Sequence, residues 1–338
     1  HAVTGLSIWT IAELTLVVFH VAAVVGVMAL DARLTGSYRA AAIAALVFTT
    51  AANFMFFDSQ FSYESFALPM VIWTLVAVVH ATGRGEGPRS RWAWVGVGAV
   101  TTAATILTHH LSSYILAGLL LLIAVGHTVA ARRNMGAVTS RAARRAAWTM
   151  ALVALGGAGL WLIEAHEVIS YYQPYVTSGV NQVIHILNRS GKSRQLFKGS
   201  TTPLYEQLMA FAGPPALLAL AVVAFVRHRR RLLTLGPTYV VLASFGVLGY
   251  FASLPFLLTA FGNEGGRRSW TFSYIGIGLL AGPVLEHYLA ARRPDTEKGL
   301  RRRRWPLAVA GFMIVLLIGN TSASVNTSYR FPGPYVYG

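Results

Sequence analysis

The sequence contains no cysteine and few charged residues. Without cysteine the chain has no disulfide, no thiolate metal ligand and no cysteine nucleophile. Only 12% of its 338 residues are charged, and acids are the rarer sign, with 12 Asp and Glu against 28 Lys and Arg. Catalytic or binding chemistry must therefore come from a small number of carboxylates together with His, Tyr and Arg.

Hydrophobic residues dominate the rest of the chain. They make up 55% of it, and the mean hydropathy of +0.54 is well above that of a soluble domain. Since a membrane-spanning helix needs about 20 mostly apolar residues, we predict an all-α fold, a polytopic transmembrane helix bundle of about ten spans. It is expected to form one domain over 1–338. The expected spans are 6–30, 40–57, 65–82, 92–108, 112–131, 147–165, 208–226, 237–260, 270–290 and 305–321.

The basic residues indicate which ends of the spans face the cytoplasm. Of the 28 Lys and Arg, 21 lie in alternate connections, including "RHRRR" and "RRRR", and the other 7 lie in the remaining connections. Because cytoplasmic loops are enriched in Lys and Arg, the first set is predicted to be cytoplasmic. Topology and anionic headgroups thus explain the net charge of +16, and nucleic acid is not expected as a partner. We predict a multi-pass cell membrane protein, and abundant Ala, Gly, Val and Arg indicate a bacterial source.

Two acids lie between two apolar runs, in "FDSQFSYES" at 57–65. An acid at the centre of a membrane helix costs about 2.5–3.5 kcal/mol, so Asp58 and Glu64 are expected at the wet mouth of a cavity. Tyr63 beside them could stack on a sugar ring or border an isoprenoid chain. The alternative interpretation is an interfacial aromatic belt with two solvated loop acids.

A histidine pair interrupts the apolar stretch from 92 to 131, in "THHLSS". A connection this short predicts a hairpin at the membrane surface. His109 and His110 could bind a metal with a carboxylate, relay protons or donate a hydrogen bond to a phosphate. They could equally be an interfacial pair that caps helix ends, and no HExxH or cysteine metal motif accompanies them.

An arginine pair lies in "FGNEGGRRSW", just before a helix that is expected to begin at Trp270. Glycines let the backbone approach a ligand closely, and arginine forks bind phosphate in a bidentate way. Glu264, Arg267 and Arg268 are therefore predicted to form a phosphate or pyrophosphate site. The alternative is an arginine pair held in a salt bridge to Glu264 or Asp58.

Two segments on the extracytoplasmic side are expected to lie outside the spans. The connection 166–207 is longer than a plain loop needs to be, and its amphipathic stretch "VNQVIHIL" could lie along the membrane surface, so we predict a lid over a site. The segment 322–338 is predicted to begin a further extracytoplasmic part that the sequence does not include.

Four stretches resemble the GT-C superfamily of polytopic glycosyltransferases. They are "TGLSIWTIAEL", "NFMFFDSQFSYESFALPM", "ILTHHLSSYILAGLLLL" and "GGRRSWTFSYIGIGLL", and together they cover about two thirds of the expected spans. They look like segments of actinobacterial-type members of the group that contains protein O-mannosyltransferases and aminoarabinose transferases. The resemblance implies transfer of a sugar from a polyprenyl-phosphate donor to a glycan, lipid or protein acceptor on the outer face.

The resemblance also implies roles for the polar residues. Arg267 and Arg268, with His109 or His110, would hold the lipid-linked phosphate as it leaves. The two acids of "FDSQFSYES" would orient the sugar, an acceptor hydroxyl or a divalent cation, and one of them could share the work of the base.

In the GT-C family the acid that acts as general base lies in the first extracytoplasmic loop. The chain is expected to begin past that point, so this acid would lie upstream of His1, and "FPGPYVYG" resembles the lead-in to an extracytoplasmic domain. Two alternatives stay open. One is a transporter or flippase of lipid-linked sugars, although its usual repeats and midplane polar residues are not visible. The other is a non-catalytic membrane subunit of a glycosyltransferase complex.

Overall fold

The computed structural model describes residues 5–56, 58, 61–83, 85–133, 139–191, 196–197, 202–260, 262–290 and 304–323. All regular structure in these ranges is helical. The elements are α1 (Ile8–Thr35), α2 (Tyr38–Thr49), α3 (Ala52–Phe56), α4 (Tyr63–Thr82), α5 (Pro88–Thr108), α6 (His110–Arg132), α7 (Arg141–Glu164), α8 (Glu167–Leu187), α9 (Leu204–Thr234), α10 (Pro237–Ser253), the 3-10 helix η1 (Leu254–Leu258), α11 (Asn263–Ala290) and α13 (Arg304–Ala323). The predicted all-α fold is confirmed for this part of the chain.

Local sequence signals set several helix starts. Serine hydroxyls at four N-caps, Ser7, Ser37, Ser62 and Ser140, accept a backbone N–H from the first turn of the helix that follows. At the end of α1, Gly36 adopts a left-handed conformation with φ of 73°, which ends the helix and turns the chain into α2. Polar residues between apolar runs thus define the hairpins of the bundle.

Six helices among the described residues have the length and composition of membrane spans. They are long and apolar enough to cross a bilayer: Ile8–Thr35, Tyr63–Thr82, His110–Arg132, Arg141–Glu164, Leu204–Val226 and Pro237–Leu258. The other four predicted spans fall on α5, on α11, on α13 and on α2 together with α3. These segments are helical, but they are not among the helices long and apolar enough to cross a bilayer. The 12-residue α2, for example, ends at Thr49, and the chain then turns through Thr50 into the short α3. Ten spans therefore stay a prediction.

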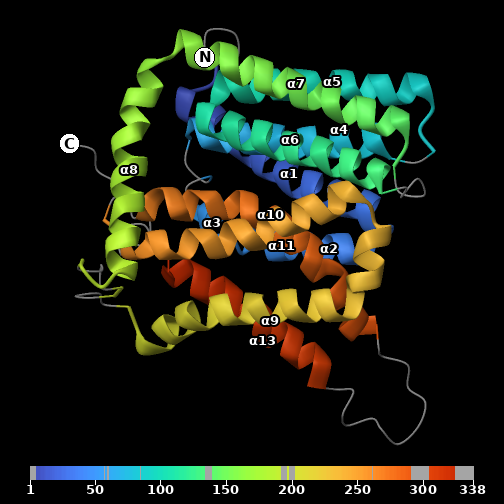
Figure 1. Ribbon diagram of the computed structural model, residues 1–338. Coiled ribbons are helices and arrows are strands. Elements are labelled where there is room, and N and C mark those ends of the chain that lie inside the picture. The colour runs from blue at the N-terminus through green and yellow to red at the C-terminus, as the bar shows by residue number, and fades with distance from the viewer. Residues whose placement is uncertain are drawn as a thin grey trace, which may run out of the picture.

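Most helices run side by side, and α8 lies across one end of the bundle, at the left of Figure 1. We call this end the α8 end. The connections from α2 to α4, from α5 to α6 and from α10 to α11 meet there. The sequence predicted a loop at 166–207, but 21 of these residues form α8, because its apolar side packs against η1. The predicted amphipathic stretch is the last part of this helix. Residues 324–338 lie outside the described part, so the predicted extension is not tested.

Small residues hold α11 firmly against α10 and α2. A Cβ added at Gly276 would lie 2.1 Å from the carbonyl oxygen of Leu242 and 2.9 Å from Cα of Gly246. On the other side, a Cβ at Gly278 would lie 2.8 Å from the carbonyl oxygen of Ala44. Close backbone contact of this kind is typical of membrane helix pairs. It gives α11 a fixed position, and with it the polar residues that α11 carries to the α8 end.

Candidate functional site

Two acids are buried at the α8 end. Asp58 lies in the turn after α3 and is 1% exposed. Glu64 lies in the first turn of α4 and is 5% exposed. Tyr63 precedes Glu64 directly but is 76% exposed, because consecutive helical residues point about 100° apart. The structure therefore brings the two predicted acids into the interior and leaves Tyr63 on the surface.

Hydrogen bonds tie these acids to two other helices. The Asn53 side-chain amide on α3 donates to Oε1 of Glu64 at 2.8 Å. The hydroxyl of Thr271 on α11 donates to Oδ2 of Asp58 at 3.3 Å, and the Asp58 backbone N–H donates to the Asn53 carbonyl at 3.0 Å. Asp58 and Glu64 are thus held in place by α3, α4 and α11 together.

Arg268 supplies a positive charge next to the acids. Its Nη1 lies 3.7 Å from Oε2 of Glu64, and its Nη2 donates to the exposed carboxylate of Glu264 one turn earlier. One alternative predicted from the sequence, a salt bridge between an arginine of the pair and Glu264, is therefore present for Arg268. Since the Arg268 side chain is 32% exposed, its guanidinium stands between the buried acids and the outside.

The start of α11 differs from the prediction. The sequence predicted a glycine-rich loop before a helix from Trp270, but α11 begins at Asn263. Gly266 lies in the first turns of this helix. A Cβ added there would lie 3.2 Å from the carbonyl oxygen of Ser253, so only glycine fits without displacing a neighbour. Arg267 and Arg268 consequently project from a helix, and Arg267 is partly buried on the same turn.

The histidine pair occupies the predicted tight turn, where α5 ends at Thr108 and α6 begins at His110. His109 is buried, and its Nδ1 lies 2.8 Å from the hydroxyl oxygen of Ser112, while the two imidazole centroids are 5.4 Å apart. Burial lowers the pKa of His109 to about 4, with help from His110 and the charge of Arg268. At neutral pH His109 is therefore an uncharged hydrogen-bonding group.

The pKa of Asp58 is shifted in the opposite direction, upward. Burial, followed by the neighbouring carboxylate of Glu64, raises the pKa of Asp58 well above its usual value, although Thr271 and Arg268 act against this. Among the described residues, Oδ1 of Asp58 and Oδ1 of Asn53 are buried without a hydrogen-bond partner. A buried acceptor without a partner is costly. These two oxygens are therefore available to a donor on a ligand, such as a hydroxyl.

The oxygen atoms of this cluster are also of the type that hard divalent cations bind. Asp58 and Glu64 provide two carboxylates, and Asn53 adds an amide oxygen. Within the described ranges, however, no three His, Asp or Glu side chains are grouped in a way that could hold a metal ion. The divalent cation predicted from the sequence stays a prediction.

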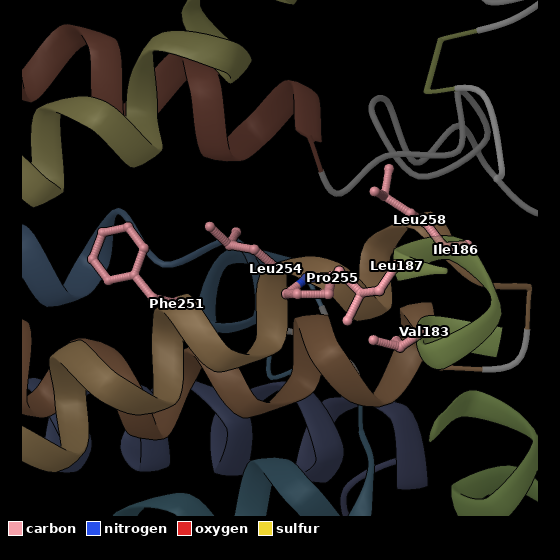
Figure 2. Close-up of a pocket in the computed structure, with 7 residues that line it drawn as sticks. All are labelled: Val183, Ile186, Leu187, Phe251, Leu254, Pro255 and Leu258. Atoms are coloured by element: carbon pink, nitrogen blue, oxygen red, sulfur yellow. The ribbon is translucent and has the colours of Figure 1, made fainter. Parts of the chain in front are cut away.

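An apolar cavity lies at the α8 end, between α8 and η1 (Figure 2). Its volume is about 430 Å³, and all seven lining residues are apolar. Three come from α8 and four from the end of α10 and from η1: Val183, Ile186, Leu187, Phe251, Leu254, Pro255 and Leu258. The cavity can take a hydrocarbon chain.

Three residues of the site were not predicted from the sequence. Asn53 lies in the apolar stretch "AANFMFF", where a lone amide is itself a signal that could have been used. Thr271 and Ser112 gave no such signal, because hydroxyl residues are common in membrane helices and bond to their own backbone. Their contacts depend on how distant segments pack.

The fold of the chain is similar to that of known membrane enzymes. It matches the apo crystal structure of the Archaeoglobus fulgidus oligosaccharyltransferase with a TM-score of 0.50 and 14% identity, covering 94% of this chain and 46% of that one. It matches the archaeal oligosaccharyltransferase AglB from the same organism, in complex with an inhibitory peptide and a dolichol-phosphate, with a TM-score of 0.51, 14% identity and coverage of 94% and 45%.

The chain thus spans just under half the length of these proteins. At this identity the likeness concerns the fold alone, so membership of the GT-C superfamily and the actinobacterial type both stay predictions. No protein-family model matches the sequence, and no curated protein sequence matches it significantly.

Proposed function

We propose that this chain is the membrane part of a glycosyltransferase that moves a sugar from a polyprenyl-phosphate donor to an acceptor on the extracytoplasmic face. The observation that carries the proposal is the cluster at the α8 end, where Arg268 adjoins the buried acids Asp58 and Glu64 and the uncharged His109. The similar fold of AglB, which was solved with a dolichol-phosphate, supports a lipid-linked phosphate as the donor.

The arginine pair has the chemistry to receive the leaving phosphate. When the glycosidic bond breaks, negative charge develops on the phosphate, and donors fixed beside it in a water-poor site stabilise that charge strongly. Arg268 is partly exposed and already positioned by two carboxylates. A phosphate would share its guanidinium with them, while Arg267 on the same turn adds a second positive charge and His109 a neutral hydrogen bond.

The buried acids are suited to holding the sugar. Asp58 Oδ1 and Asn53 Oδ1 can each accept a hydroxyl hydrogen. Glu64 is oriented by Asn53 and balanced by Arg268. In our proposal these groups orient the sugar, an acceptor hydroxyl or a divalent cation, and Asp58 in its ionised form could act as a base.

The cavity between α8 and η1 gives the lipid part of the donor a place. Its wall is apolar, and its lining residues belong to α8, the end of α10 and η1, at the α8 end of the bundle. An isoprenoid chain bound there would be removed from water, which favours binding in proportion to the apolar area buried. The distribution of Lys and Arg between alternate connections supports an extracytoplasmic position for this end.

A transfer assay tests this function. The full-length protein, reconstituted in liposomes, is given radiolabelled polyprenyl-phosphate mannose, glucose or arabinose together with glycan, lipid and peptide acceptors. We expect one donor to label one acceptor class, with an equal amount of polyprenyl phosphate released. Movement of the labelled lipid across the bilayer without transfer would instead identify a flippase. Transfer only after a second protein is added would identify a non-catalytic subunit.

A further inference from the structure

One face of α8 is fixed to the turn that leads into α11. The backbone N–H of Ala260 donates to Oε1 of Gln182 at 2.9 Å. One turn earlier on α8, Gly179 is buried, and a Cβ added to it would lie 3.4 Å from Cα of Gly262. Gln182 and Gly179 lie on the same side of α8 as Val183 and Ile186, which line the apolar cavity. The contact with the turn and the cavity are therefore two parts of one surface.

The turn itself is held by hydrogen bonds on both sides. The Thr259 hydroxyl donates to the Phe256 carbonyl at 2.8 Å and accepts the backbone N–H of Gly262 at 2.9 Å. The side chain of Asn263 donates to the carbonyl of Ala260 at 3.0 Å. Thr259 is also 1% exposed. These bonds link Ala260 and Gly262 to η1 on one side and to the start of α11 on the other.

Beyond the turn, the first residues of α11 pack closely on η1 and on the end of α10. Gly266 is near the Ser253 carbonyl and Cβ of Phe256, and Trp270 donates its indole N–H to the hydroxyl of Ser253 at 2.8 Å. Arg267 and Arg268 lie between these two contacts along the helix. Their place at the α8 end therefore depends on η1, the end of α10 and the turn to which α8 is attached, in addition to the packing of α11 on α10 and α2.

We propose that Gln182 is a positioning residue for the transfer reaction, and that it acts by fixing Ala260 and, with it, the start of α11 and the Arg268 guanidinium. This inference rests on the proposed function. A chain bound in the apolar cavity touches Val183 and Ile186 on α8 and Leu254 on η1, so it sets the spacing between these elements. Through Gln182, a lipid-linked donor aligns the arginine that receives its own phosphate.

Two substitutions separate the hydrogen bond from the bulk of the side chain. Gln182→Leu keeps the volume and removes the acceptor, while Gln182→Glu keeps an acceptor oxygen. Gln173→Leu is the matched control, because Gln173 is on the same helix but exposed. Loss of one hydrogen bond corresponds to about a three- to tenfold change in an equilibrium or rate. We expect Gln182→Leu to lower kcat by about this factor with the KM for the donor within twofold. Gln182→Glu and Gln173→Leu are expected to stay near the parent protein.

Hydrogen exchange gives a second readout that needs no activity. In the donor-free protein, Gln182→Leu is expected to speed exchange at the Ala260 amide and in the first turn of α11, and Gln182→Glu to restore it. Unchanged exchange, a change in KM alone, or kcat equal to that of the parent would each overturn the proposal. If the parent protein shows no transfer at all, the proposed function fails and the catalytic role of Gln182 fails with it. The exchange result then still decides whether Gln182 holds the turn.

Discussion

Replacing Arg268 by glutamine is expected to lower the rate of sugar transfer about 100- to 1000-fold, the cost of removing one donor that stabilises transition-state charge. The expectation follows from its position, since Arg268 contacts both Glu64 and Glu264 and lowers the pKa of both Asp58 and His109. The loss should appear mainly in kcat when transfer from a polyprenyl-phosphate sugar is measured in liposomes.

Two further variants show whether the lower transfer rate of Arg268→Gln comes from the lost positive charge or from unfolding of the protein. Arg268→Lys keeps a positive charge beside Glu64 and should recover part of the activity, although lysine lacks the bidentate fork. Arg89→Gln makes the same substitution on an exposed residue at the other end of the bundle and should leave the rate unchanged. If Arg268→Gln keeps more than half of the parent rate while its melting temperature is unchanged, Arg268 has no part in the reaction.

Transfer should also increase with pH as Asp58 loses its proton. Burial and Glu64 raise the pKa of Asp58 well above its usual value, so the acid stays protonated, and unable to act as base or ion ligand, at pH values where an exposed Asp is ionised. Asp58→Asn should lower the rate about 100-fold, the lower range for removing a general acid or base, and abolish the increase with pH. Glu167→Gln, which changes an exposed acid on α8, should keep both the rate and the pH profile.

The same residue makes a prediction for stability. Because the folded protein binds a proton at Asp58 more readily than the unfolded chain does, the contribution of Asp58 is most favourable below the usual pKa of an aspartate. It is lost as the pH rises through the raised value. Each unit by which the pKa of Asp58 differs between the folded and unfolded chain corresponds to about 1.4 kcal/mol in the free energy of unfolding. Asp58→Asn should therefore flatten the fall in melting temperature with pH, and an unchanged slope would mean that Asp58 is not the group responsible.

The apolar runs were sufficient to predict where most helices lie. Runs of about 20 apolar residues form helices for physical reasons that are local, because each backbone group must be bonded within the segment in lipid. The helix α8 was predicted as part of a loop with one amphipathic stretch in its last eight residues, because Pro174 and several Tyr, Gln and Ser residues are typical of a loop. Its amphipathic character becomes informative only when η1 is present to cover the apolar side.

Contacts between distant segments explain what the sequence did not predict at the site. Asp58 and Glu64 were predicted because acids are scarce in apolar sequence, but Thr271 is 213 residues from the Asp58 that it bonds. The start of α11 was placed too late for a similar reason. Gly265 and Gly266 are typical of a loop, and only the closeness of Ser253 shows why a glycine belongs in a helix there.

Tyr63 illustrates the limit of adjacency in sequence. It was predicted to stack on a sugar ring or border an isoprenoid chain beside the two acids, yet α4 begins at Tyr63 and turns the side chains of Tyr63 and Glu64 in different directions. Glu64 points to Asn53 and Arg268, whereas Tyr63 is exposed. A role in binding the substrate is therefore still a prediction for Tyr63, and would require the ligand to extend to the surface of the α8 end.

Photolabelling of the donor site tests the central claim most directly. A polyprenyl phosphate with a diazirine on its first isoprene unit is bound to the full-length protein, irradiated, and located by mass spectrometry of peptides. The account predicts labels at the α8 end, within 58–66, 107–114, 183–187 or 251–271, and competition by an unlabelled polyprenyl-phosphate sugar. Labels confined to the opposite end of the bundle, around Arg33, Glu86 and Arg91, would contradict it.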